Sequence, residues 1–399
     1  MQQWKKNVYL LWAAVFIAAV CWSMVMPFMP VFLEEELGVT EGVAAWAGVL
    51  GAVNSFGMAI TAPFWGALGD RYGRKLMMLR AGISLTVCYA LMSMVTGPYG
   101  LLGVRVLIGV LTGFIPTATA LVGVTTPQEH VGAALSLVST AQPTGSILGP
   151  MLGGLLGDLV GIRATMAANA VLAGMATLLV VFFVREQFTP VVRENGNLLT
   201  DLGEVLRQRT FAALVVTSML AMAAMSTLDP VLVPYIKEIL GPGAPNSLAG
   251  LLVSLPGAAF VAAAPWWAAR ASRWGFDRTV TLGLTLGAAV AVLQAVAFRM
   301  WDFGGLRLAQ GIFTASVSPG IAALIAQTLP QSLRGRAFGL NQSANNLGLV
   351  AGPLLGGFIG TWAGARWGFV ATGVLFALAA AWTSLVVAPR VRSGTHRAA

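Results

Sequence analysis

The sequence predicts an all-α membrane protein with twelve transmembrane helices in two pseudo-symmetric six-helix bundles. Three observations favour this fold class. Hydrophobic residues make up 57% of the chain and charged residues only 10%, which is far less charge than a soluble domain of 399 residues exposes. The apolar residues gather into twelve runs, each long enough to cross a bilayer. The two halves of the chain also repeat one another in the positions of Gly, Pro and Arg.

The twelve apolar runs form two groups of six, with a polar interval between them. In the first half they lie at about 8–33, 44–68, 76–96, 99–123, 131–157 and 164–184, and in the second at about 211–235, 247–268, 279–298, 303–328, 337–360 and 367–388. The interval 185–210 carries four acidic and four basic residues and is interpreted as a solvated cytoplasmic linker, where a surface helix near 198–208 would fit. We therefore expect one bundle at 1–184, a linker at 185–210, and a second bundle at 211–399 that ends in a short cytoplasmic tail.

Basic residues set the expected orientation of the spans. If both termini are cytoplasmic, the cytoplasmic segments hold eighteen of the 24 Lys and Arg residues, external loops hold four, and two lie inside spans. Cytoplasmic loops of membrane proteins are enriched in Lys and Arg, so this asymmetry predicts cytoplasmic termini in a multi-pass protein of a bacterial inner membrane. It also accounts for the net charge of +9 without nucleic-acid binding, which we do not expect.

Cysteine and histidine are too few to suggest a metal site or a disulfide framework. Cys21 and Cys88 lie inside apolar runs, while His130 and His396 stand alone in a loop and in the tail. No cluster of His, Asp or Cys marks an active site at a helix end, so we expect neither an enzyme nor a bound cofactor.

The two halves repeat with an offset of 202 or 203 residues. Pro27 matches Pro230, and Arg105 matches Arg307. The sequence Gly-Pro-x-x-Gly-Gly occurs at 149–154 and again at 352–357. Repeats of this kind place the substrate site between the halves, near the middle of the bilayer.

A charged turn separates the second and third predicted spans. The stretch 66–75 reads GALGDRYGRK, and its charges cannot lie in hydrocarbon, so they place the turn at the membrane surface. Its glycines let the chain leave one helix and start the next, and Asp70 can pair with a nearby Arg to hold two helix ends together in one conformation. The alternative is a plain topology signal. The predicted conformational latch consists of Gly66, Asp70, Arg71, Gly73, Arg74 and Lys75.

Glycines recur every four residues in the fifth and eleventh spans. Such spacing puts them on one stripe of a helix, where a neighbouring helix can approach closely, and simple helix packing is part of the explanation. Pro150 removes a backbone hydrogen bond and allows a bend where the halves rock against one another. The candidate motif residues in the fifth span are Gly145, Gly149, Pro150, Gly153 and Gly154.

Three charged residues within apolar runs are candidates for a functional role. Intramembrane charges usually face a cavity or a partner. Asp229 is the one carboxylate clearly inside a run, and such a group can bind and release a proton as its surroundings dry and wet. We expect it to carry the coupling proton, with Arg105 in the other half as its charge partner. Alternatively, Asp229 lies in water near the external face, and Arg105 and Arg307 extend to the membrane interface.

Polar and adaptable apolar residues within the spans are candidates for a substrate cavity. Amides can orient a substrate, and Met repacks around ligands of different shape, although such residues often face lipid instead. The candidates are Met26, Asn54, Gln142, Met225, Phe260, Asn341 and Asn345.

The motifs together resemble those of the major facilitator superfamily, in particular its twelve-span drug:proton antiporters. The charged turn resembles the loop between the second and third helices of that family, and the sequence 101–113, LLGVRVLIGVLTG, is similar to its fourth-span motif, whose Arg is associated with proton coupling. G-x-x-x-G-P-x-x-G-G at 145–154 looks like the signature of its exporters.

Two features depart from the family pattern. The first span lacks the acidic residue that several of these exporters carry, and Ser272 stands in the second half where the first has Asp70. The resemblance implies a monomeric exporter that moves small amphipathic compounds out of the cell by proton antiport, with the proton as the only coupling ion. A transporter of the same fold for one defined substrate, such as a sugar, a metabolite or a lysolipid, is the alternative. A receptor would not need the glycine stripes and the latch together.

Overall fold

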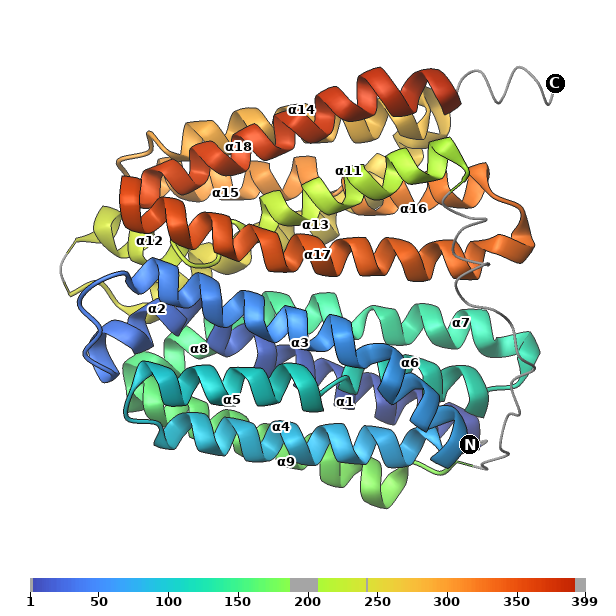
Figure 1. Ribbon diagram of the computed structural model, residues 1–399, viewed down its shortest axis with the longest axis horizontal. Helices are drawn as coiled ribbons and strands as arrows, with labels where there is room; N and C mark the ends of the chain where they lie inside the picture. The colour runs from blue at the N-terminus through green and yellow to red at the C-terminus, as the bar shows by residue number, and fades with distance from the viewer. Residues whose placement is uncertain (1–2, 187–206, 242, 392–399) are drawn as a thin grey trace. The chain divides into compact units, whose positions relative to one another are not determined.

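The computed structural model describes residues 3–186, 207–241 and 243–391 (Figure 1). All regular elements in these ranges are helical, which confirms the all-α prediction. Most of the predicted linker at 185–210, including the position of the suggested surface helix, lies outside the described residues, as does the end of the predicted tail. The described chain groups into two compact units, one of residues 3–46, 53–186 and 243–254, and one of residues 47–52, 207–241 and 255–391.

The first unit is built around α1, which packs along α8 and α9, while α4 lies alongside α9 and α6 (Figure 1). Its elements are α1 (Gln3–Val25), η1 (Met26–Phe28), α2 (Met29–Val31), η2 (Phe32–Glu36), α3 (Val43–Tyr72, without residues 47–52), α4 (Arg74–Met94), α5 (Pro98–Leu111), α6 (Phe114–Thr125), α7 (Gln128–Ser139), α8 (Ala141–Val160) and α9 (Ile162–Phe183).

The second unit repeats this plan, because α11 packs along α17 and α18, and α14 lies alongside α18 and α16. Its elements are α11 (Arg209–Ser226), α12 (Leu232–Leu240), α13 (Asn246–Trp274, without its first residues to 254), α14 (Phe276–Gln294), α15 (Met300–Thr314), α16 (Val317–Thr328), α17 (Gln331–Ala363), α18 (Ala365–Trp382) and η3 (Thr383–Val387).

Eleven helical segments of the described chain are long and apolar enough to cross a membrane. The remaining predicted span, 131–157, is the fifth along the chain. It is divided at Thr140 into α7 and α8, and α8 is rich in Gly, which lowers its mean hydropathy. Two other spans are interrupted at equivalent positions. Gly113, with φ of 125°, separates α5 from α6, and Ala315 and Ser316 separate α15 from α16. The break in the fourth span of each half therefore follows the sequence repeat, whereas the break at Thr140 has no counterpart in the continuous helix α17.

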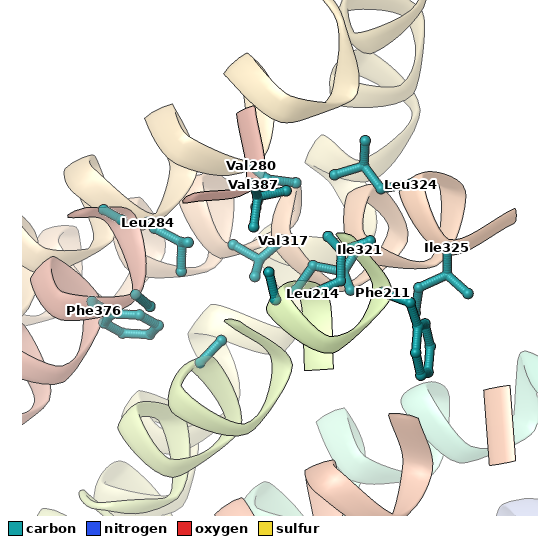
Figure 2. Packing of buried hydrophobic residues seen from close by; sticks show 14 of the residues in the cluster. Phe211, Leu214, Val280, Leu284, Val317, Ile321, Leu324, Ile325, Phe376 and Val387 are labelled. Carbon is teal, nitrogen blue, oxygen red and sulfur yellow. The ribbon is translucent and has the colours of Figure 1, made fainter. Parts of the chain in front are cut away.

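Burial of aliphatic and aromatic side chains holds the second unit together. Figure 2 shows Phe211 and Leu214 of α11 near Ile321 of α16, with Val280 of α14 in the same core. These side chains are at most 2% exposed. Association of membrane helices is driven by such close packing, because lipid tails are as apolar as the side chains themselves.

Candidate functional site

The predicted latch forms the junction of α3 and α4. Gly73, the single residue between the two helices, has φ of 101°, a left-handed conformation that favours glycine. The Arg74 guanidinium donates a hydrogen bond to the Asp70 carboxylate at 2.6 Å, which ties the start of α4 to the end of α3. The expected ion pair is thus present. The glycine prediction was wrong for Gly66, which lies inside α3 and takes no part in the turn.

Glu186 completes the latch and was not singled out in the sequence. Its carboxylate accepts hydrogen bonds from the backbone N–H groups of Arg74 at 3.0 Å and Lys75 at 2.8 Å. The first N–H groups of a helix have no partner within it, and a negative charge there also complements the helix dipole. Lys75 extends back to the carbonyl of Val181 at 3.0 Å, so the loop is held to the end of α9 from both sides. Sequence spacing alone does not bring a residue 111 positions away to this helix start.

Arg71, the remaining latch residue, points elsewhere. Its guanidinium lies 5.3 Å from the centre of the Tyr72 ring, and its side chain is exposed. An exposed cation over an aromatic ring contributes at most about 1 kcal/mol. The pairing role expected of an Arg next to Asp70 belongs to Arg74.

Arg105 lies in the core of the first unit. Only 1% of its surface is exposed, so it does not extend to the membrane interface in this structure. The guanidinium donates to the thioether sulfur of Met26 and lies 5.8 Å from the centre of the Trp22 ring. Arg105, which was predicted to take part in proton coupling, is therefore in contact with Met26, which was predicted to line the substrate cavity.

Arg307 occupies the equivalent place in the second unit, where it is also buried. The charged group that acts electrostatically on Asp229 within this unit is Arg307. The sequence had suggested Arg105 for this task, but Arg105 belongs to the other unit, and its pairing with Asp229 stays a prediction. Asp229 and Met26 are repeat partners, because Asp229 directly precedes Pro230 and Met26 directly precedes the matching Pro27.

The glycine stripes pack against helices of their own unit. A Cβ at Gly145 would lie 2.7 Å from the Phe16 carbonyl oxygen of α1, and one at Gly149 would overlap the Ser23 hydroxyl. Gly153 faces the carbonyl of Met24 equally closely. In the second unit Gly348, Gly352 and Gly356 approach α11 in the same way. The predicted close approach is confirmed, and its partner is the first helix of each half.

The last glycine of the motif faces a different helix. Gly154 contacts the Asn246 carbonyl at the start of α13, and Gly250 of α13 contacts the Pro150 carbonyl. All four residues belong to the first unit. The second unit contains the repeat of this packing, in which Gly48 of α3 contacts the Pro353 carbonyl of α17. Gly48 and Gly250 are 202 positions apart, so the repeat offset could have revealed them.

A carboxylate reinforces the contact of α8 with α13. Asp158 accepts hydrogen bonds from the backbone N–H groups of Asn246 at 2.7 Å and Ser247 at 2.8 Å. These N–H groups belong to the first turn of α13 and have no hydrogen-bond partner within that helix. Asp158 therefore acts as a helix cap across the packing surface formed by Gly154 and Gly250.

The candidate cavity residues are divided between the units, with Met26, Asn54 and Gln142 in the first and the others in the second. Asn54 is fully buried, and its Oδ1 atom, like that of Asn341, has no hydrogen-bond partner among the described residues. Buried acceptors without a partner are rare and mark places where a ligand or water can bind. Gln142 and Met225 are exposed, and Phe260 and Asn345 are partly buried. No group of three or more His, Cys, Asp or Glu residues in the described ranges could hold a metal ion.

The chain matches one family model over most of its length. Residues 11–241 and 214–399 each match the model described as Major Facilitator Superfamily. The chain is 33% identical to the multidrug resistance protein MdtG of Proteus mirabilis (strain HI4320) over 387 residues, which is 96% of this chain and 96% of that protein. It is 32% identical to MdtG of Salmonella typhimurium over 388 residues, again 96% of each chain.

Solved structures share the fold at much lower identity. The nucleoside transporter NupG gives a TM-score of 0.81 at 12% identity, covering 95% of this chain and 99% of that one. A bacterial homolog of the human lysosomal transporter Spinster gives 0.79 at 14% identity and covers 98% of both chains. At these identities the likeness concerns the fold alone.

Proposed function

The chain belongs to the major facilitator superfamily, and we infer from this premise that it is a multidrug efflux transporter, which exports small amphipathic compounds by proton antiport. The observation that carries this proposal is the 33% identity to a multidrug resistance protein over 96% of both chains. The glycine-proline motif, which resembles that of exporters, agrees with it.

Asp229 is the proposed proton carrier. A carboxylate favours its neutral form when it is dry and its ionised form when water or a cation is near, so it can take a proton on one side of the membrane and release it on the other. Arg307, a buried cation of the same unit, supports this role, because a cation near a carboxylate favours its ionised form. Arg105, buried in the first unit, is the second proposed coupling residue.

Alternating access needs contacts that form in one conformation and break in another. The latch of Asp70, Arg74 and Glu186 is the proposed contact at the cytoplasmic side. Two contacts are proposed for the external side. One is the packing of α8 on α13 with the Asp158 cap, and the other is the packing of Gly48 on α17. Glycine contacts suit this task because they contain few rotatable side chains that must be reordered in each cycle.

The amide and apolar candidates are the proposed substrate contacts of each unit, with Asn54 and Met26 in the first and Asn341 and Met225 in the second. The amides would orient a substrate, and the methionines would offer adaptable apolar surface. We propose that both termini lie in the cytoplasm and that the protein lies in the bacterial inner membrane, which the distribution of basic residues supports. The unit of function is proposed to be the monomer.

Transport by purified protein in proteoliposomes tests the proposal. Several chemically unrelated amphipathic compounds should each accumulate in vesicles with an acidic lumen, and a protonophore should abolish the accumulation. Asp229→Asn should lose accumulation, whereas Asp302→Asn, at an exposed acid, should retain it. Accumulation of one compound only would favour the single-substrate alternative, and accumulation that ignores the pH gradient would contradict antiport.

A further inference from the structure

A groove on the second unit lies apart from every residue assigned to transport. It has a volume of about 420 Å³ and is bounded by α14 on one side and by η3 and the chain that follows it on the other. This α14 groove, as we call it, is lined by Arg278, Thr281, Leu282, Thr285, Ser384, Ala388 and Pro389. Its volume falls in the range of about 300 to 1,000 Å³ that is usual for small-ligand sites.

The groove lies on the outer side of α14. Positions 278, 281, 282 and 285 follow the spacing of one helix face. The opposite face carries Val280 and Leu284, which point into the core of the unit (Figure 2). The outer face of a peripheral helix in a membrane protein meets lipid, and Leu385 next to the groove is 76% exposed. The surroundings of the groove are therefore suited to acyl chains.

The polar groups of the groove have a definite donor and acceptor pattern. Arg278 is exposed and supplies a cation, and the lining contains no acidic residue. Thr281 and Thr285 donate their hydroxyl hydrogens to carbonyls one turn earlier, both at 2.8 Å, and Ser384 donates to the Ala381 carbonyl at 2.9 Å. Their oxygens keep lone pairs that can accept hydrogen bonds.

The nearby charges leave the groove positive. Asp277, next to Arg278, is buried rather than exposed toward the groove, and Arg390 follows directly after the lining residue Pro389. Arg390 donates to the Arg209 carbonyl, which holds it at the same end of the unit. A ligand that fits this site carries an anion for Arg278 and hydroxyl donors for the side-chain oxygens of the lining.

We propose that the α14 groove binds the head group of an anionic phospholipid with free hydroxyl groups, of which phosphatidylglycerol is the simplest. Its phosphate pairs with Arg278, its two free glycerol hydroxyls donate to the oxygens of Thr281 and Thr285, and its chains run along the exposed apolar surface beside Leu385. Basic pockets between helices at the cytoplasmic side are a known type of site for anionic lipids. The placement in that leaflet rests on the proposed orientation, whereas the binding itself does not depend on the proposed transport.

Native mass spectrometry of the full-length protein in detergent tests the proposal, because it counts bound lipids without a transport assay. Phosphatidylglycerol should bind in preference to phosphatidylcholine, and Arg278→Gln should weaken the binding about fivefold, the change expected for one basic residue near an anionic lipid. Arg273→Gln is the matched control, since Arg273 is an exposed cation one helix earlier that does not line the groove.

Two further arms separate the head group from simpler anions. The double variant Thr281→Val, Thr285→Val should lose the preference for phosphatidylglycerol over phosphatidic acid, which lacks the glycerol hydroxyls, while keeping the wild-type affinity for phosphatidic acid. Inorganic phosphate and glycerol 3-phosphate should fail to displace the lipid at equal concentration. Equal binding by Arg278→Gln and Arg273→Gln, or displacement by the free anions, would overturn the proposal.

Discussion

Each half of the molecule has a buried arginine at the same repeat position, but the side chain that interacts with this arginine differs between the halves. In the first unit Arg105 contacts the neutral thioether of Met26, and in the second Arg307 acts on the carboxylate of Asp229. Met26 and Asp229 are themselves repeat partners. The scaffold therefore places one cation in each half, and we propose that the single residue before the matched proline determines which half carries the coupling proton.

Other features show where the halves remain alike. Both have a helix break in the fourth span of the half, and both pack a glycine stripe onto the first helix of the half. The latch differs, because the first half has the Asp70–Arg74 pair and the second has Ser272, whose hydroxyl donates to the Ala269 carbonyl of its own helix. The shared helix breaks and stripe contacts with the first helix of each half are expected to serve folding, and the latch of the first half is expected to serve transport.

The largest expected effect concerns a shared feature. Gly149→Leu and Gly352→Leu should both abolish membrane-inserted, folded protein, because each side chain would overlap a serine hydroxyl and the neighbouring backbone of the first helix of its half. The measurement is the yield of monodisperse protein after detergent extraction. Gly103→Leu is the control, since a Cβ there meets no atom within 4 Å and should leave the yield unchanged. Normal yield from one stripe variant but not the other would show that the stripes are not equivalent.

The next effect separates the halves. Asp229→Asn should reduce uphill, proton-driven transport by at least about a hundredfold while leaving substrate binding intact, because the amide cannot exchange a proton. Met26→Leu, at the repeat partner, should retain most uphill transport since a volume-conserving apolar exchange is usually tolerated. Transport and binding are measured on the same reconstituted samples. Uphill transport by Asp229→Asn would place the proton site elsewhere.

The latch should give an intermediate effect. Asp70→Asn removes the charge of the pair with Arg74 and should lower transport about tenfold, a loss that corresponds to about 1.4 kcal/mol. The amount of the Asp70→Asn variant in the membrane should stay near that of the parent protein. Ser272→Ala at the equivalent place in the second half should change neither quantity. An equal loss in both variants would mean that the latch is not confined to the first half.

The smallest effect is a shift in pH dependence. Loss of the Arg307 cation should favour the protonated form of its neighbour, so Arg307→Gln should move the pH of half-maximal transport upward by about one unit. Arg105→Gln faces a thioether that does not titrate and should leave this pH in place, even where it lowers the rate. The comparison needs full pH profiles at equal protein density. A shift in the Arg105 variant alone would support the cross-unit pairing with Asp229.

Much of the architecture follows from the sequence alone. Twelve spans, the repeat and the charged turn could be recognised because apolar length, Gly and Pro spacing and clustered charge are local properties that the bilayer constrains strongly. The Asp70–Arg74 pair belongs to the same class, since its members are four residues apart. The division of one predicted span at Thr140 was missed, although Gln142 and Pro143 lie just after it, because polar residues and a proline also occur inside unbroken helices such as α17.

Contacts between distant residues depended on the tertiary structure. The caps made by Glu186 on α4 and Asp158 on α13 join residues 111 and 88 positions apart. Their local sequences look like ordinary helix ends. Only the packing of the helices determines which unpaired N–H groups at a helix start each carboxylate contacts. The same holds for the interaction of Arg307 with Asp229. The sequence predicted that a cation would pair with Asp229, but it could not predict which arginine. Local patterns determine where helices begin and end, and the three-dimensional packing determines which charges share a site.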